Sequence, residues 1–163
     1  TELQWDLPNL VSHGGLQYCV QKLNELYRNE PALYEKQFYT EGFEWLDLTK
    51  RDACVISYRR KGLLPENDIV ILLNLTGAVY ENWEIELYGK TTWKEIFNTD
   101  NIEYWGSGNF DNAALRIEPV KAETMEEIFT GTEDAPLENA QDKIPKNCKV
   151  TVSLPGLSAI ILK

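Results

Sequence analysis

The sequence contains few of the residues that metal sites and disulfide frameworks require. Its 163 residues include one histidine, His13, and three cysteines, Cys19, Cys54 and Cys148, with no C-x-x-C pair. A metal site built from histidines or thiolates is therefore not expected, and a Ser-His-Asp triad could use only His13. Because the cysteines are odd in number and far apart, we expect reduced, buried thiols in a cytoplasmic protein.

Basic residues and long apolar runs are also scarce. The chain carries 16 basic against 26 acidic side chains, a formal net charge of −10 and a sequence pI near 4.6. Since nucleic-acid binding depends on clustered Lys and Arg, a nucleic-acid partner is not expected. The sequence has no run of about 18 apolar residues and no basic-then-apolar start, so we expect no membrane span and no secretory signal.

The remaining composition is that of a globular protein, with one domain or one domain and a fragment of another. Helical spacing occurs before Pro31, where apolar residues step by three and four: Leu16, Cys19, Val20, Leu23, Leu26 and Tyr27. This spacing predicts one amphipathic helix over about residues 13–29, with Ser12 as its N-cap.

After Tyr34 the apolar residues alternate instead, which is the period of a strand. The segments that fit strands are residues 43–47, 53–59, 69–75, 83–87, 93–97, 115–118, 150–154 and 157–162. Residues 69–75 form a continuous apolar run, typical of a strand covered on both faces. Short strands separated by Gly, Asn, Asp and Pro predict an antiparallel β-sandwich or barrel, and we expect the sandwich.

Two segments do not fit regular elements. Residues 100–113 are rich in Gly, Asn and Asp and are predicted to form a loop. Residues 119–147 are acidic and interrupted by Pro136 and Pro145, so we interpret them as an insertion with at most one helical turn, around residues 125–129.

The glycine-rich part of the first loop is a candidate binding site. Residues 104–109 contain neither G-x-G-x-x-G nor G-K-[ST], so a surface turn is favoured over a phosphate cradle and no cofactor is predicted. An exposed Trp105 beside Tyr104 and Asn109 would suit a sugar, because the indole stacks on C–H groups while polar side chains bind hydroxyls. A Trp105 that only pins the loop is the alternative. Trp83 and Trp93 lie in alternating segments and are predicted core residues.

Carboxylates are abundant, but their placement does not predict a catalytic pair. Retaining glycosidases need two carboxyl groups about 5–5.5 Å apart on facing elements. Glu84 and Glu86 alternate along a predicted strand, and Glu126 and Glu127 are adjacent in the acidic segment, so both pairs are expected on solvated faces. None lies in an apolar run that would raise its pKa for acid catalysis. No catalytic residue is predicted in this chain.

Several segments share their sequence and their order with one enzyme family. They are Ser12-His13-Gly14-Gly15-Leu16-Gln17, Leu23-Asn24-Glu25-Leu26-Tyr27-Arg28, Gly42-Phe43-Glu44-Trp45-Leu46-Asp47, Val55-Ile56-Ser57-Tyr58-Arg59-Arg60, Asn74-Leu75-Thr76, residues 93–100, residues 104–108 and Leu154-Pro155-Gly156-Leu157-Ser158-Ala159. Together they resemble the C-terminal part of bacterial 1,4-alpha-glucan branching enzymes of the alpha-amylase family. Trp105 departs from the family, which commonly has a small residue or His there, and residues 119–147 carry no family motif.

The resemblance implies an antiparallel β-sandwich of the alpha-amylase C-terminal type over residues 35–163, preceded in residues 1–34 by the last helix of a (β/α)8 barrel. It implies a parent enzyme that forms a glycosyl-enzyme intermediate from an alpha-1,4 glucan and transfers the segment to a sugar 6-hydroxyl, forming alpha-1,6 branches in glycogen. The start of the helix would face the catalytic mouth, so His13 and Trp5 are implied at the border of a glucan cleft.

The family's nucleophilic Asp and acid Glu match no position of this sequence. We therefore expect the chain alone to be inactive and its catalytic barrel to be supplied in cis. Two other functions stay open. A stand-alone carbohydrate-binding β-sandwich would hold glucan through Trp105, Tyr104 and neighbouring polar groups such as Asn109, and an interaction domain would self-associate through the apolar stripe of the helix.

Overall fold

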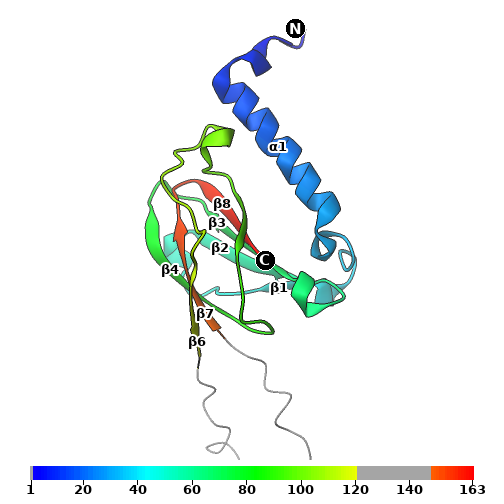
Figure 1. The fold of residues 1–163 in the computed structure, drawn as a ribbon, viewed down its shortest axis with the longest axis vertical. Coiled ribbons are helices and arrows are strands. Elements are labelled where there is room, and N and C mark those ends of the chain that lie inside the picture. Colours follow the sequence, from blue (N-terminus) through cyan, green and yellow to red (C-terminus); the bar gives the residue numbers. More distant parts are fainter. Residues whose placement is uncertain (1, 121–147) are drawn as a thin grey trace, which may run out of the picture.

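The computed structural model describes residues 2–120 and 148–163, which form one long helix and two antiparallel sheets (Figure 1). The helix and strands are α1 (Val11–Asn29), β1 (Phe43–Trp45), β2 (Val55–Arg60), β3 (Ile69–Asn74), β4 (Tyr80–Leu87), β5 (Glu95–Asn98), β6 (Arg116–Pro119), β7 (Cys148–Leu154) and β8 (Ser158–Leu162). Short 3-10 turns connect them: η1 (Leu7–Asn9), η2 (Pro31–Leu33), η3 (Thr40–Gly42), η4 (Arg51–Ala53), η5 (Pro65–Asn67) and η6 (Ile102–Tyr104).

The strands form a β-sandwich, as the sequence predicted. One sheet has five strands in the order β1-β2-β3-β8-β5, and the other has three in the order β4-β7-β6. Every neighbouring pair is antiparallel. The two sheets enclose a core of alternate residues, including Val70 and Leu72 of β3 and Val150 and Val152 of β7. Burial of these side chains is the dominant favourable contribution to folding.

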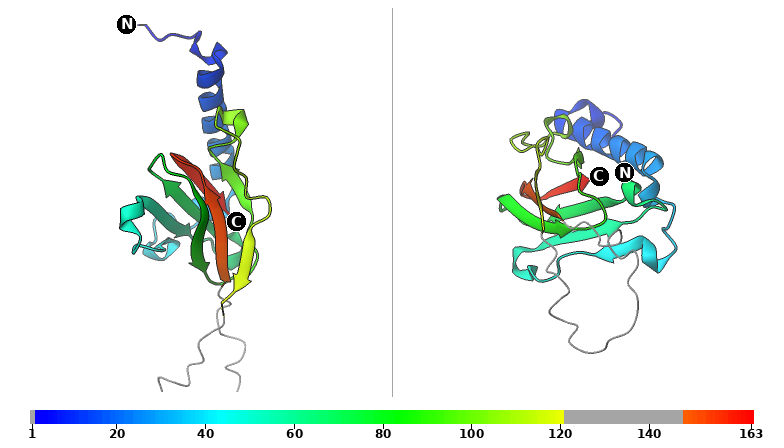
Figure 2. Two further views of the ribbon diagram at one scale, coloured as in Figure 1. Left: turned by 90° about the vertical axis from the view of Figure 1, so that its left-hand side faces the viewer. Right: turned by 60° about the horizontal axis from the view of Figure 1, so that its bottom comes forward.

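The five-stranded sheet is covered on its outer face by α1, which lies along one side of the sandwich (Figure 2). Cys19 of α1 packs in a second cluster with Ile69 and Ile71 of β3, Phe97 of β5 and Ile161 of β8. Strand β3 is therefore buried on both faces, which explains the continuous apolar run at residues 69–75.

The helix starts two residues earlier than expected. It begins at Val11, and Ser12 lies inside its first turn, so the predicted Ser12 N-cap is wrong. Leu10 lies between η1 and α1 with an extended backbone and is the N-cap of α1, without a side-chain cap. Its carbonyl accepts the first hydrogen bond of the helix, from the N–H of Gly14 at 2.8 Å. The helix is followed by Pro31, as predicted.

Most of the other local expectations are confirmed, with one correction. Trp83 and Trp93 are buried in the core. All three cysteines are free, and Cys19 and Cys148 are buried, but Cys54 is exposed because it forms the left-handed corner that leads into β2. The expected helical turn at 125–129, the Glu126 and Glu127 pair and nearly all of the insertion at 119–147 lie outside the described residues. No helix in the part of the chain described is long and apolar enough to cross a membrane.

Candidate functional site

Two of the residues predicted to contact sugar, Trp5 and His13, lie at the start of α1. The Trp5 side chain is 80% exposed, and His13 is also exposed. Both line a surface pocket of about 470 Å³ together with apolar side chains that include Leu16 and Val20. The Ser12 hydroxyl oxygen lies 3.2 Å from Nδ1 of His13. The structure therefore brings Trp5 and His13 to one largely apolar surface.

The loop at residues 100–113 places its two aromatic residues differently. The Tyr104 ring stacks on Phe97 at 5.4 Å between ring centroids and lies 5.7 Å from the Tyr18 ring of α1. Tyr104 is therefore a packing residue between the helix and the sheet. The neighbouring Trp105 is 66% exposed and has a left-handed backbone with φ of 68°. A left-handed conformation is uncommon for a bulky residue. The Cβ of Trp105 lies close to α1, because a methyl group added at Gly15 would be 2.9 Å from it.

Hydrogen bonds within the loop hold Trp105 in this position. The Asp100 carboxylate accepts from the backbone N–H of Ser107 at 2.9 Å and from its hydroxyl at 2.5 Å. The N–H of Gly108 donates to the Asp100 carbonyl at 2.8 Å. Asn109 is exposed two residues after Ser107, and its N–H donates to the Ser107 hydroxyl. Trp105 and Asn109 thus lie on one ordered, solvent-facing loop beside α1.

A second aromatic surface lies at the β1 edge of the five-stranded sheet. Here Phe43 and Trp45 of β1 meet Tyr58 of β2, and we call these three residues the edge aromatic cluster. Phe43 stacks on Tyr58 at 5.3 Å and meets Trp45 edge-on at 4.9 Å. Trp45 is directly opposite Tyr58 in the strand register and is 51% exposed. The cluster lies on the outer face of this sheet, since Tyr58 also packs against the buried residues beneath α1.

The edge aromatic cluster borders a surface pocket of about 510 Å³. Phe38, which is 90% exposed, forms part of the pocket with Phe43 and Tyr58. Gln37 and Arg60 contribute the polar side chains. A surface that combines aromatic rings with amide and guanidinium donors has the chemistry needed to stack on a sugar ring and bind its hydroxyls.

The sequence pattern predicted a strand over residues 43–47 but did not indicate this cluster as a site. The available signal was the two-residue spacing of Phe43 and Trp45, which places both on one face of a strand. Their meeting with Tyr58 depends on the pairing register of β1 and β2, which the sequence does not reveal.

A groove of about 520 Å³ between the β1 and β4 edges of the two sheets is lined by several charged side chains. Its carboxylates include Glu44, Asp47 and Glu84. The hydrogen bond and ion pair with Lys149 at 2.7 Å lower the pKa of Glu84. Hydrogen bonds from the side chain and backbone of Thr49 lower the pKa of Asp47.

Glu44, the third carboxylate of this groove, is also held in its charged form. Burial opposes its ionisation, but hydrogen bonds from Lys61 and Tyr88 outweigh it and lower the pKa of Glu44. Lys61 forms an ion pair with Glu44 at 2.8 Å. A general acid must hold a proton near neutral pH, so a carboxylate with a lowered pKa is poorly suited to that role.

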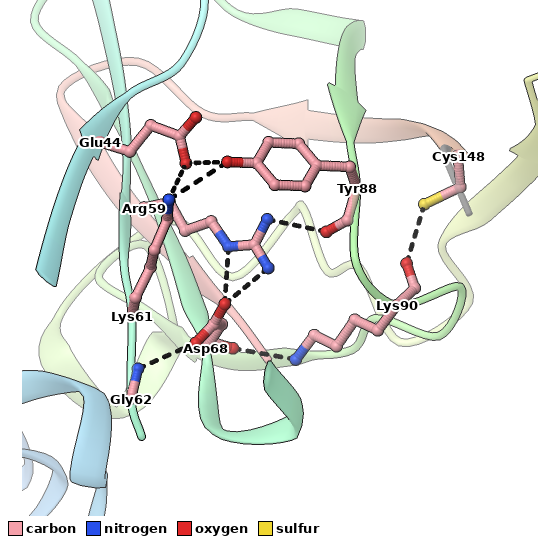
Figure 3. Close-up of polar contacts among 8 residues, drawn as sticks. All are labelled: Glu44, Arg59, Lys61, Gly62, Asp68, Tyr88, Lys90 and Cys148. Carbon is pink, nitrogen blue, oxygen red and sulfur yellow. Dashed lines mark hydrogen bonds and ion pairs between the residues drawn. The ribbon is translucent and has the colours of Figure 1, made fainter. Parts of the chain in front are cut away.

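A buried ion pair stabilises the sandwich behind this groove (Figure 3). Nε and Nη2 of Arg59 donate to one carboxylate oxygen of Asp68 at 2.9 and 2.6 Å. The other oxygen of Asp68 accepts from the N–H of Gly62 at 2.9 Å, and Nη1 of Arg59 donates to the Tyr88 carbonyl at 2.7 Å. Since Arg59 lies on β2 and Tyr88 follows β4, these bonds connect the two sheets. Across the described residues, no group of three or more His, Cys, Asp or Glu is placed to hold a metal ion.

Comparisons with known proteins point to one group of enzymes. The family model described as the alpha amylase C-terminal all-beta domain matches residues 45–163. The 1,4-alpha-glucan branching enzyme of Aquifex aeolicus is 35% identical over 166 residues, which cover 100% of this chain and 22% of the relative. The enzymes of the same name from Nitrosomonas europaea and Oceanobacillus iheyensis are 32% identical over 162 residues and 38% identical over 110 residues, covering 99% and 68% of this chain. These two alignments cover 19% and 17% of the respective relatives, so the chain spans about a fifth of their length.

Proposed function

The chain belongs to the family of alpha-amylase C-terminal all-beta domains, and from this we propose that it is the C-terminal part of a 1,4-alpha-glucan branching enzyme. The proposal is supported by relatives of that name that align with almost the entire chain at 32–35% identity. A stand-alone sugar-binding module is not favoured by this similarity. The reaction of the whole enzyme would be the transfer of alpha-1,4-linked glucan segments to form alpha-1,6 branches, in the cytoplasm.

Within such an enzyme, residues 1–34 would end the catalytic barrel and residues 35–163 would form the C-terminal β domain. The structure of α1 supports this division, because some of its apolar residues pack on the sheet and others are exposed. Cys19 packs on the sheet, whereas Leu16 and Val20 are 62% and 49% exposed. An apolar helix face of this kind is unfavourable in water unless another surface covers it. The rest of the catalytic barrel would cover this side of α1, and in its absence a second copy of the chain could do so.

We place the contact with glucan at the edge aromatic cluster and treat Trp105 and Asn109 as a second candidate surface. The observation that carries this choice is the exposed pocket at Phe38, Phe43 and Tyr58, with Gln37 and Arg60 beside it. The cluster provides several rings in fixed mutual contact, whereas the loop provides one exposed indole. Rings that are already ordered lose little conformational entropy when a ligand binds.

The role of the chain itself would be binding rather than catalysis. The groove carboxylates described above are held in their charged forms by lysine, threonine and tyrosine partners. An assay of the purified chain with a linear alpha-1,4 glucan, scored by the new alpha-1,6 linkages and by released reducing ends, should therefore give no turnover. An intact branching enzyme is the positive control, and turnover above the blank would contradict a non-catalytic role.

Titration with maltoheptaose tests the binding role and locates the surface. We expect saturable binding to the intact chain in calorimetry, a loss of at least about tenfold in affinity in Trp45→Ala, and little change in Trp105→Ala. The two variants are matched controls for each other, because each removes one exposed indole. The opposite pattern would move the contact to the loop, and the absence of saturable binding to the intact chain would refute glucan contact by this domain.

A further inference from the structure

The pocket beside the edge aromatic cluster is lined mainly by hydrogen-bond donors. Its polar side chains are Gln37, Tyr58 and Arg60, and no aspartate or glutamate of the described residues lines it. A guanidinium has five N–H donors and no acceptor, and a phenol and an amide each add N–H or O–H groups. The pocket therefore offers a ligand more donors than acceptors, together with the positive charge of Arg60.

The donors of Gln37 and Tyr58 are not used by other parts of the described structure. The side-chain oxygen of Gln37 accepts from the Tyr27 hydroxyl at 3.0 Å, which leaves the amide N–H groups available. Burial raises the pKa of Tyr58, although the charge of Arg60 opposes this, so the phenol keeps its proton at neutral pH. Both side chains can therefore donate to a ligand in the pocket.

Arg60 lacks a counter-charge at this position. It lies directly opposite Phe43 in the strand register and two residues after Tyr58, on the outer face of the sheet. Its side chain is half-buried, and its Nε is buried without a hydrogen-bond partner among the described residues. A guanidinium that has lost part of its hydration and has no anion beside it is stabilised when an anion binds.

The carboxylates close in sequence to this pocket do not line it: Glu35, Glu41 and Glu44. Glu44 points to the opposite face of β1, where it forms the ion pair with Lys61 at 2.8 Å. The Glu35 carboxylate accepts from the backbone N–H of Leu63 at 2.8 Å, and Glu41 is exposed to solvent. Within the described residues, the pocket thus contains no anion that would compete with a ligand for Arg60.

We propose, on the basis of the glucan contact proposed above, that this pocket prefers a glucan unit carrying an acidic group and that Arg60 binds that group. A sugar hydroxyl both donates and accepts hydrogen bonds, so a neutral sugar would make poor use of a lining composed of donors. A carboxylate or a phosphate ester supplies several acceptor oxygens and forms paired hydrogen bonds with a guanidinium.

The pocket has room for a sugar ring beside its acidic group. Its volume of about 510 Å³ lies within the range of small-molecule sites. The ring of Phe38 is exposed, and Phe43 is fixed by its stacking on Tyr58, so both can pack on the C–H groups of a sugar. The net charge of −10 opposes an anion, but at 0.15 M salt charges more than about 8 Å apart are largely screened. The direct contact with Arg60 then dominates.

Calorimetric titration of the full chain at 0.15 M salt tests the preference with three probes. They are maltoheptaose, maltoheptaose phosphorylated at a 6-hydroxyl, and maltoheptaose oxidised at its reducing end to a carboxylate. We expect an acidic probe to bind at least about tenfold more tightly than maltoheptaose, and a preference for one acidic probe would identify the group as phosphate or carboxylate. Equal affinity for all three probes would overturn this inference and leave the glucan contact intact, whereas no binding of any probe would refute both.

Removing the charge of Arg60 tests which residue is responsible. In Arg60→Gln we expect the acidic and neutral probes to bind within about twofold of each other, while Arg60→Lys keeps part of the preference because it keeps the charge without the paired donors. Arg28→Gln is the matched control, since it removes the same charge from an exposed position of α1 and should retain the preference. A preference that persists in Arg60→Gln would overturn the assignment.

A second substitution tests the same reasoning without changing a strand. Gln37 is exposed, and in Gln37→Glu the new carboxylate can still accept from the Tyr27 hydroxyl while it adds a negative charge to the pocket. We expect the preference to fall to within about twofold in this variant and to persist in Asn24→Asp, which adds the same charge at an exposed position of α1. An unchanged preference in Gln37→Glu would show that the charge of the pocket does not select the ligand, and would also overturn the proposal.

Discussion

Replacing Asp68 by Asn should be among the most destabilising conservative changes in this protein. The substitution keeps the shape of the side chain but removes the negative charge that two nitrogens of Arg59 contact at 2.6 and 2.9 Å. The Arg59 side chain is only 2% exposed, so its guanidinium cannot recover hydration without moving the strand. The variant would therefore contain a buried and uncompensated positive charge.

The magnitude follows from the environment that Arg59 keeps. Removing one partner of a buried ion pair costs about 3–5 kcal/mol, because the remaining charge has lost both water and its counter-ion. Two contacts moderate this cost in Asp68→Asn. The Tyr88 carbonyl still accepts from Nη1 of Arg59 at 2.7 Å, and the Tyr88 ring lies 4.6 Å from the guanidinium carbon. We therefore expect a loss near the lower limit, about 3 kcal/mol of unfolding free energy.

Urea unfolding followed by tryptophan fluorescence and far-ultraviolet circular dichroism measures this loss. With a urea dependence of about 2 kcal/mol per molar for a chain of this size, the midpoint should fall by about 1.5 M. The matched control is Glu118→Gln, which breaks the exposed Arg116–Glu118 pair and should move the midpoint by no more than about 0.5 M. A midpoint shift in Asp68→Asn as small as that of the control would refute the view that burial of the pair decides its importance.

Two further changes test other contacts. Burial raises the pKa of Glu95 despite a hydrogen bond from Asn112 at 2.7 Å. The protonated Glu95 side chain therefore contributes stability below the ordinary pKa of a glutamate, and this contribution is lost as pH rises through the raised pKa. Glu95→Gln, which cannot ionise, should therefore gain stability relative to the unmodified chain as pH rises above the ordinary pKa of a glutamate, and a difference in urea midpoints that does not change with pH would contradict this. Gly15→Ala should lower the melting temperature although alanine normally favours a helix by about 1 kcal/mol, because the added methyl would lie 2.8 Å from the Tyr104 backbone. Gly77→Ala, with nothing within 4 Å of the added methyl, is the control, and an increased melting temperature of Gly15→Ala would refute close packing of α1 on η6.

The helix and the strands could be predicted wherever burial of one face leaves a regular spacing of apolar residues in the sequence. Alternation along Trp83, Ile85 and Leu87 predicted β4, and the continuous run from Ile69 predicted a strand covered twice. Boundaries were less predictable, because they depend on individual backbone bonds. The first turn of α1 is an example, since the N-cap is Leu10 and not the expected Ser12, and no side chain caps the helix there.

The candidate sites were predicted only in part, because exposure is a property of the assembled molecule. Trp5 and Trp105 are exposed as expected, but Tyr104, which the sequence grouped with Trp105, packs on Phe97 and Tyr18. The edge aromatic cluster and the pairing of Arg59 with Asp68 join different strands or segments, so no local pattern contains them.

By itself, the sequence determined the class of the fold, the family and the kinds of site that are not expected, because periodicity, composition and motif order are local properties of the chain. Only the tertiary structure decided which aromatic rings face water and which carboxylates have a cationic partner. Those outcomes depend on strand register and on how α1 lies against one sheet, and both are set by contacts between residues that are distant in sequence.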